Sequence, residues 1–179
     1  MAAATTEFVA HGVAGARVDR IAAAADANKR LIYDHFGDKD GLFDAVLDQV
    51  TGHAVGAVPI DATDLPGYAG RLFEYHLDNP DLLRLVTWAR LEGRTTTSAQ
   101  EQRRASYQRR VAAIEEAQRN RTIATVPDAS KLLDMIESLA VGWTAAARAL
   151  LATPRQLKAG RAAQRDAIIE AVRRIVEPP

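Results

Sequence analysis

The sequence predicts an all-α protein in which an N-terminal unit of three helices precedes a larger helical bundle. Apolar residues make up 47% of the chain and recur at spacings of three and four, the period of a helix. Alternating runs of β-branched and aromatic residues, which would indicate strands, are scarce. The 179 residues suit one large or two small domains, and we expect two, at residues 1–48 and 49–179.

The first informative segment lies between residues 17 and 28. An apolar stripe with helical spacing predicts a helix of about two turns, formed by Val18, Ile21, Ala22 and Ala25. Asn28 is suited to cap the following helix, because its side-chain oxygen can accept a backbone N–H that has no partner within the helix. Arg17 stands before the stripe and cannot cap in this way, so we expect the first helix to have a frayed start.

A second short helix is predicted from about residue 29 to residue 36. Ile32 and Phe36 share one face of it and are expected to pack on the preceding stripe. The opposite face carries hydrogen-bonding side chains: Lys29, Arg30, Tyr33, Asp34 and His35. Gly37 is suited to end this helix and Asp38 to cap the next, which begins with Lys39. Two short helices joined by a tight turn, with a polar outer face, are the arrangement that lays one helix in the major groove of DNA.

At this point the segment resembles the TetR family of bacterial transcriptional repressors, over about residues 7–47. The tract IYDHFGDKDGLF carries the resemblance, at its distance after IAAAADA, together with Phe8 and Gly12. The resemblance implies a helix-turn-helix with groove or phosphate contacts from Arg17, Asn28, Lys29, Arg30, Tyr33, Asp34, His35 and Lys39. The chain departs from the family at Arg17, where Ser or Thr is usual, and at Asp34, where an aromatic residue or His is common. A carboxylate at Asp34 is repelled by phosphates but can accept a hydrogen bond from cytosine N4.

The charge balance gives no independent support for DNA binding. Lysine plus arginine equals aspartate plus glutamate, 23 of each. Residues 1–50 contain five cations against eight anions, a net charge of −3. We therefore expect modest non-specific DNA binding with a shallow salt dependence.

After residue 50, a stretch rich in Gly, Pro and Asp predicts a loop over residues 52–67. Helices are then predicted over about 66–77, 80–92, 99–120, 128–151 and from Pro154 onward. The last two carry apolar faces and small residues, and the resemblance implies that they pair with their copies across a two-fold axis. The residues expected at this homodimer surface are Leu132, Ile136, Leu139, Trp143, Ile168, Ala171, Val172 and Ile175. The alternative is that these helices complete the core of a single chain.

A small-molecule effector is expected in the second domain. Its candidate lining residues are apolar or aromatic with a few hydrogen-bonding tips: Leu72, Tyr75, His76, Trp88, Leu91, Tyr107 and Trp143. Each of them could instead belong to the core. No cofactor and no metal is expected, because the chain has no cysteine and its four histidines lack metal-ligand spacing.

Together these features predict a ligand-responsive homodimeric transcriptional repressor. It would bind a palindromic double-stranded DNA operator and be released by a small-molecule effector. Two alternatives stay open: a helical partner-binding module without DNA binding, and an enzyme, for which no triad or phosphate loop is present. The N-terminus lacks the features of a signal peptide, and the most apolar run is too short to cross a bilayer. We expect a cytoplasmic protein with no membrane partner.

Overall fold

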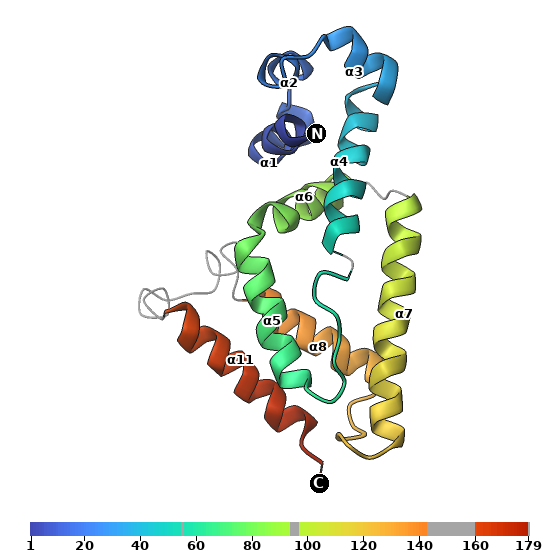
Figure 1. The fold of residues 1–179 in the computed structure, drawn as a ribbon, viewed down its shortest axis with the longest axis vertical. Helices are drawn as coiled ribbons and strands as arrows, with labels where there is room; N and C mark the ends of the chain where they lie inside the picture. Colours follow the sequence, from blue (N-terminus) through green and yellow to red (C-terminus); the bar gives the residue numbers. More distant parts are fainter. Residues whose placement is uncertain (55, 94–96, 143–159, 179) are drawn as a thin grey trace. The chain divides into compact units, whose positions relative to one another are not determined.

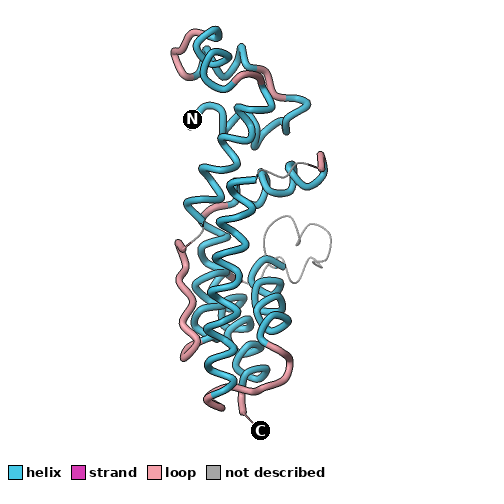
Figure 2. The backbone as a smooth tube through the Cα atoms, turned by 90° about the vertical axis from the view of Figure 1, so that its right-hand side faces the viewer, coloured by secondary structure: helices cyan, strands magenta, loops and turns pink. Residues whose placement is uncertain are grey.

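The computed structural model describes residues 1–54, 56–93, 97–142 and 160–178. All regular elements in these ranges are helices and none is a strand, which confirms the predicted all-α class (Figure 2). The helices are α1 (Ala2–Gly15), α2 (Val18–Ala24), α3 (Lys29–Phe36), α4 (Lys39–Ala54), α5 (Leu65–Asp78), α6 (Pro80–Leu91), α7 (Thr97–Arg119), α8 (Ala129–Gly142) and α11 (Arg161–Val176). In the part of the chain that is described, no helix combines the length and the apolar character needed to cross a membrane.

The chain forms two compact units. The first unit comprises Met1–Val55 and Asp81–Arg103, and the second comprises Gly56–Pro80 and Arg104–Pro179. Helix α6 therefore belongs with α1 to α4, although α5 separates it from them in the sequence. Helix α7 begins in the first unit and continues into the second.

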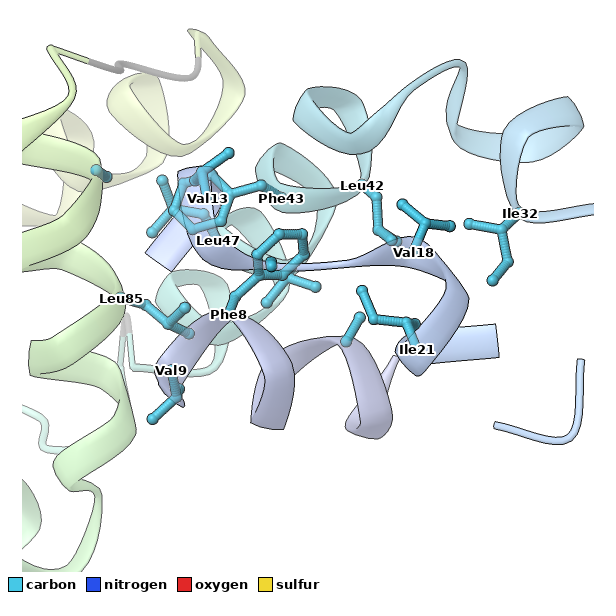
Figure 3. Close-up of a cluster of buried hydrophobic side chains, with 14 of the residues drawn as sticks. Phe8, Val9, Val13, Val18, Ile21, Ile32, Leu42, Phe43, Leu47 and Leu85 are labelled. Carbon is cyan, nitrogen blue, oxygen red and sulfur yellow. The ribbon is translucent and has the colours of Figure 1, made fainter. Parts of the chain in front are cut away.

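One apolar core holds the first unit together (Figure 3). The rings of Phe8 on α1 and Phe43 on α4 meet edge to face, with centroids 5.1 Å apart, a favourable aromatic geometry. Leu85 on α6 is fully buried in the same cluster. Ala25, predicted to belong to the apolar stripe of α2, is instead exposed. The reason is that α2 ends at Ala24, so the fourth position of the stripe falls beyond the helix.

Helix α1 contains a break at Gly12, which has φ +64° and ψ −177°. This backbone conformation is essentially restricted to glycine. The ring of Trp88 on α6 lies against the break, so that a Cβ atom at position 12 would lie 3.0 Å from its nearest atoms, closer than ordinary van der Waals contact. Glycine is therefore favoured at this position both for its conformation and for the close approach of the indole.

The second unit is built around α5, which packs against both α8 and α11 (Figure 1). Asp64 caps α5 by accepting a hydrogen bond from the N–H of Gly67 at 2.8 Å, and Pro66 occupies its first turn. The predicted loop is shorter than expected at both ends, because α4 extends to Ala54 and α5 begins at Leu65. Helix α7 begins at Thr97. The end predicted near Leu151 for the helix that starts at residue 128, and the start predicted at Pro154 for the last helix, both lie outside the described residues.

The core of the second unit includes four residues predicted for the dimer surface. Leu132, Ile136, Ile168 and Val172 are at most 1% exposed and pack with Tyr68 and other residues of α5. The structure corrects the prediction for these four, because their side chains are already covered within one chain. Leu139, Ala171 and Ile175 are partly buried, and Trp143 lies outside the described residues.

Candidate nucleic-acid interface

The turn between α2 and α3 is formed by residues with specific local roles. Asp26 adopts a left-handed conformation with φ +48°, which Asp tolerates better than most residues. Asn28 caps α3, and its side-chain oxygen accepts a hydrogen bond from the N–H of Arg30 at 2.8 Å. Both the predicted cap and the predicted bounds of α3 are confirmed. Of the eight residues of α3, Ile32 is the one that is buried, in the core shared with Val18 (Figure 3).

The end of α3 is equally well defined. Gly37 has φ +80°, and its N–H donates to the carbonyl of Tyr33 at 2.8 Å. Asp38 then accepts a hydrogen bond from the N–H of Gly41 at 2.7 Å and so caps α4. The predicted roles of Gly37 and Asp38 are confirmed, and together with Asn28 they hold α3 between two fixed turns.

The polar face of α3 is exposed, and two of its cations already have anionic neighbours. Lys29 Nζ lies 2.6 Å from Asp19 Oδ1, and this hydrogen bond raises the pKa of the Lys29 ammonium. Arg30 Nε lies 3.8 Å from Asp34 Oδ2, one turn along the helix. Exposed pairs of this kind contribute little to stability, so they can be exchanged for contacts with another anion. They also lower the positive charge that the helix presents.

Two aromatic side chains flank this surface. Tyr33 is 38% exposed, and its ring centroid lies 5.9 Å from Lys29 Nζ. His35 is exposed and meets the ring of Phe36 edge-on, with centroids 4.6 Å apart. Both are exposed and carry hydrogen-bonding groups.

Leu31 belongs to the same surface and was not predicted from the sequence. Its side chain is 65% exposed, among the polar residues of α3. Leucine has no hydrogen-bonding side chain, so Leu31 was not among the polar residues expected on α3. Its position in the helix could have indicated its exposure, because Leu31 does not share the face of Ile32 and Phe36.

The start of α2 is held by a residue from another helix. Arg17 makes no side-chain cap, but its backbone N–H donates to Glu7 Oε1 on α1 at 2.9 Å. The same oxygen accepts from Arg20 Nε at 2.8 Å and Nη2 at 2.5 Å, and Arg20 Nη2 also donates to the carbonyl of Gly15 at 3.1 Å. The hydrogen bond from Arg20 is the main reason that the pKa of Glu7 is lowered. The expected frayed start is therefore corrected, because a carboxylate ten residues earlier holds it.

Lys39 contributes to the same region from the start of α4. Its ammonium group donates to the carbonyls of Ala14 at 3.2 Å and Ala16 at 3.3 Å. Two of its three N–H groups are thus used within the chain. A contact between Lys39 and phosphate stays a prediction, as do the contacts from Arg17 and α3.

The residues predicted for the effector site do not lie in one unit. Trp88 packs in the core of the first unit, and Leu91 in the same unit is 72% exposed. Leu72, Tyr75 and His76 are partly buried on α5 in the second unit. Tyr107 lies in the second unit on α7, and Trp143 falls outside the described residues. The sequence could not separate these two groups, because α6 follows α5 directly.

Two buried polar groups stand out in the second unit. The Nδ1 atom of His76 has no hydrogen-bond partner among the described residues, and burial lowers the pKa of its ring. Arg110 is paired with Glu137 and donates to the Tyr68 hydroxyl at 3.3 Å. Its Nε atom is buried with no partner in the described part of the chain. Burial also raises the pKa of Glu137, although Arg110 opposes that shift.

Comparison with known proteins assigns the chain to a family. Residues 1–46 match the model of bacterial regulatory proteins of the tetR family. Residues 64–174 match the model of the tetracyclin repressor-like C-terminal domain. The chain therefore belongs to the TetR family of bacterial regulators, as the resemblance implied.

Individual relatives agree along nearly the whole chain. The HTH-type transcriptional repressor SCO4008 of Streptomyces coelicolor is 39% identical over 183 residues, covering 98% of this chain and 92% of the relative. A crystal structure of SCO4942 from the same organism, described as a candidate transcriptional regulator, is 35% identical with a TM-score of 0.84, and the match covers 99% of this chain and 96% of that one. A tetR-family regulatory protein from Rhodococcus RHA1, 21% identical, shares the fold with a TM-score of 0.74 over 99% of this chain and 95% of that one.

Proposed function

We propose that this protein is a homodimeric transcriptional repressor that binds a palindromic DNA operator and is released by a small-molecule effector. The observation that carries the proposal is the division of α3 into two sides. Ile32 is buried in the core, whereas Lys29, Arg30, Tyr33, Asp34 and His35 are all exposed on a helix capped at both ends. A recognition helix needs this division, because one side must fix it and the other must enter the major groove.

The contacts with DNA fall into two kinds. Arg17, Lys29 and Lys39 carry charges suited to phosphate, which positions a protein without reading sequence. The side chains of Arg30 and Asp34 are 87% and 63% exposed, and together with the aromatic residues they are suited to base edges. Arginine pairs with guanine and a carboxylate accepts from cytosine N4. The operator would therefore be read mainly by the middle of α3.

A palindromic operator requires two copies of the chain with recognition helices about 34–36 Å apart. The homodimer is supported by membership of the TetR family and by the partly exposed apolar residues that remain on α8 and α11. Met135 is 42% exposed on α8, and Leu139, Ala171 and Ile175 are only partly buried. These residues replace the four buried ones as the proposed dimer surface.

The effector is proposed to bind in the second unit. His76 and Arg110 each have a buried nitrogen without a hydrogen-bond partner among the described residues, and Leu72, Tyr75 and Tyr107 lie in the same unit. A ligand lowers operator affinity only by as much as it prefers the conformation that cannot bind DNA.

The DNA-binding domain is proposed to be residues 1–48, and α6 packs against their core.

The test is fluorescence anisotropy with DNA from upstream of the protein's own gene. Arg30→Ala should weaken binding by about 1–3 kcal/mol if Arg30 pairs with guanine. Arg119→Ala is the matched control, because Arg119 is also exposed and paired with an acid one turn away, at Glu116. It should leave binding unchanged. Wild-type protein that distinguishes no sequence at low salt would instead favour a partner-binding module.

A further inference from the structure

Glu7 occupies an unusual position for an acidic side chain. It lies on α1, yet its carboxylate is only 10% exposed and is directed at the start of α2. One oxygen accepts three hydrogen bonds, from the Arg17 backbone and from two nitrogens of Arg20. Oε2 lies 3.8 Å from His11 Nε2 on the same helix.

The hydrogen bond to Arg17 has a known counterpart within single helices. In a capping box, Glu or Gln at the third helical position reaches back to the backbone N–H of the N-cap residue. Here the N-cap residue is Arg17, and the third helical position holds Arg20, which has no acceptor to offer. Glu7 provides the carboxylate from another helix, and Arg20 binds that carboxylate instead of the backbone.

We propose that Glu7 is a positioning residue for DNA binding: from α1 it completes the cap of α2 and so fixes where α2, and α3 after it, sit against α1. This proposal rests on the proposed function of α3. A turn of four residues, 25–28, joins α2 to α3, so a displaced α2 carries the recognition helix with it. A site of this kind depends on placement within about 0.5 Å.

The surrounding contacts agree with this role. Arg20 bridges Glu7 and the carbonyl of Gly15, and Lys39 from α4 binds the carbonyls of Ala14 and Ala16. The connection between α1 and α2 is thus held by charged side chains from three helices, where a local Ser or Thr cap is absent. Glu7 is the one anion in this set, and it receives hydrogen bonds from both the backbone and Arg20.

The experiment is a two-residue cycle measured by operator anisotropy at a temperature where circular dichroism shows every variant folded. Glu7→Gln keeps the size of the side chain but removes the ionic bond to Arg20 and leaves the Arg17 N–H a neutral acceptor. Because a hydrogen bond to a charged acceptor is about twice as strong as one to a neutral acceptor, Kd should rise roughly three- to tenfold. Removing a negative charge would by itself tighten binding to DNA, so a weaker complex opposes the simple electrostatic trend.

Arg20→Glu supplies the discriminating second step. In the wild-type background it places two carboxylates together and should weaken binding further than Glu7→Gln does. In the Glu7→Gln background it puts a charged acceptor at the third helical position, where it can bind the Arg17 N–H as in a capping box, and should improve binding. The charge change is the same in both backgrounds, so an opposite sign of effect is not explained by net charge. Glu116→Gln, which alters another surface acid paired with arginine, should leave Kd unchanged.

Amide hydrogen exchange at Arg17 is measured alongside, because it does not require DNA. Faster exchange of this amide in Glu7→Gln, together with the reversed effect of Arg20→Glu, supports the proposal. An unchanged Kd in Glu7→Gln, or the same direction of effect for Arg20→Glu in both backgrounds, overturns it. Wild-type protein with a protected Arg17 amide but no operator binding overturns the proposed function, and with it the positioning role.

Discussion

The indole ring of Trp88 lies against the backbone of Gly12, so close that a Cβ atom at position 12 would be 3.0 Å from ring atoms Cδ2 and Cε3. Trp88 is on α6 and Gly12 is at the break in α1, and both belong to the first unit. Helix α6 follows α5 in the chain, and α5 belongs to the second unit. The contact therefore fixes α1 against α6, the helix that directly follows α5 in the chain.

Gly12→Ala should destabilise the protein by about 1–3 kcal/mol, because it combines backbone strain with overpacking against the ring. Equilibrium unfolding in urea, followed by circular dichroism, measures the change. Making the same change in a Trp88→Leu background separates the two causes, because it removes the ring beside position 12 and keeps the backbone strain. An equal loss in both backgrounds would mean that the Trp88 contact contributes nothing.

Asp19→Asn should tighten binding to DNA. It removes an anion beside α3 and releases Lys29, whose ammonium lies 2.6 Å from Asp19. We expect a several-fold lower Kd, with log K falling more steeply against log salt by up to about 0.9 if Lys29 gains one phosphate. Asp166→Asn is the matched control, because the Asp166 side chain is 72% exposed against 73% for Asp19. A similar gain in both variants would assign the effect to net charge alone.

Leu31 is expected to contact a thymine methyl group in the operator, since an apolar side chain on a recognition helix can read that group alone. Replacing the contacted thymine by deoxyuridine removes one methyl, and the wild-type protein should lose about 0.8 kcal/mol, a roughly fourfold change in Kd. Leu31→Ala should bind both DNAs alike. If every thymine-to-uracil change affects the two proteins equally, Leu31 reads no methyl group.

His76 should make stability depend on pH between neutrality and mildly acidic solution. Burial holds its folded pKa below the usual value of 6.5, so the unfolded chain takes up a proton first as the pH falls. Wild-type stability should therefore decrease below about pH 6.5, by at most about 1.4 kcal/mol per pH unit from this one group. His76→Gln should lack this part of the decrease in urea unfolding, whereas His53→Gln, at an exposed histidine, should retain it. Parallel curves for wild type and His76→Gln would show that His76 does not contribute.

The sequence predicted α3 to the residue because the signals that bound it are local. Asn28, Gly37 and Asp38 each act within three or four residues of their own position. The role of Glu7 could not be predicted in this way, since the N–H that it binds is ten residues away and is brought near only by the fold.

The sequence indicated which faces of α8 and α11 are apolar, but not which part of the protein covers them. Periodicity identifies the side of a helix that is buried, whether a neighbouring helix or a second chain covers it. For Leu132 and Val172 the cover is α5 of the same chain. The packing of α6 could not be predicted for a related reason, because Leu85 and Trp88 reach a core whose members on α1 to α4 lie more than thirty positions earlier in the sequence.

Because the first unit is assembled from two separate stretches of chain, it cannot be transplanted by a single cut. A hybrid regulator made by exchanging only the first fifty residues would present Phe8 and Val9 to a foreign α6, with no assurance that a ring fits over Gly12. Engineers who wish to give this protein a new operator should graft the outward side chains of α3 alone, or move α6 together with α1 to α4.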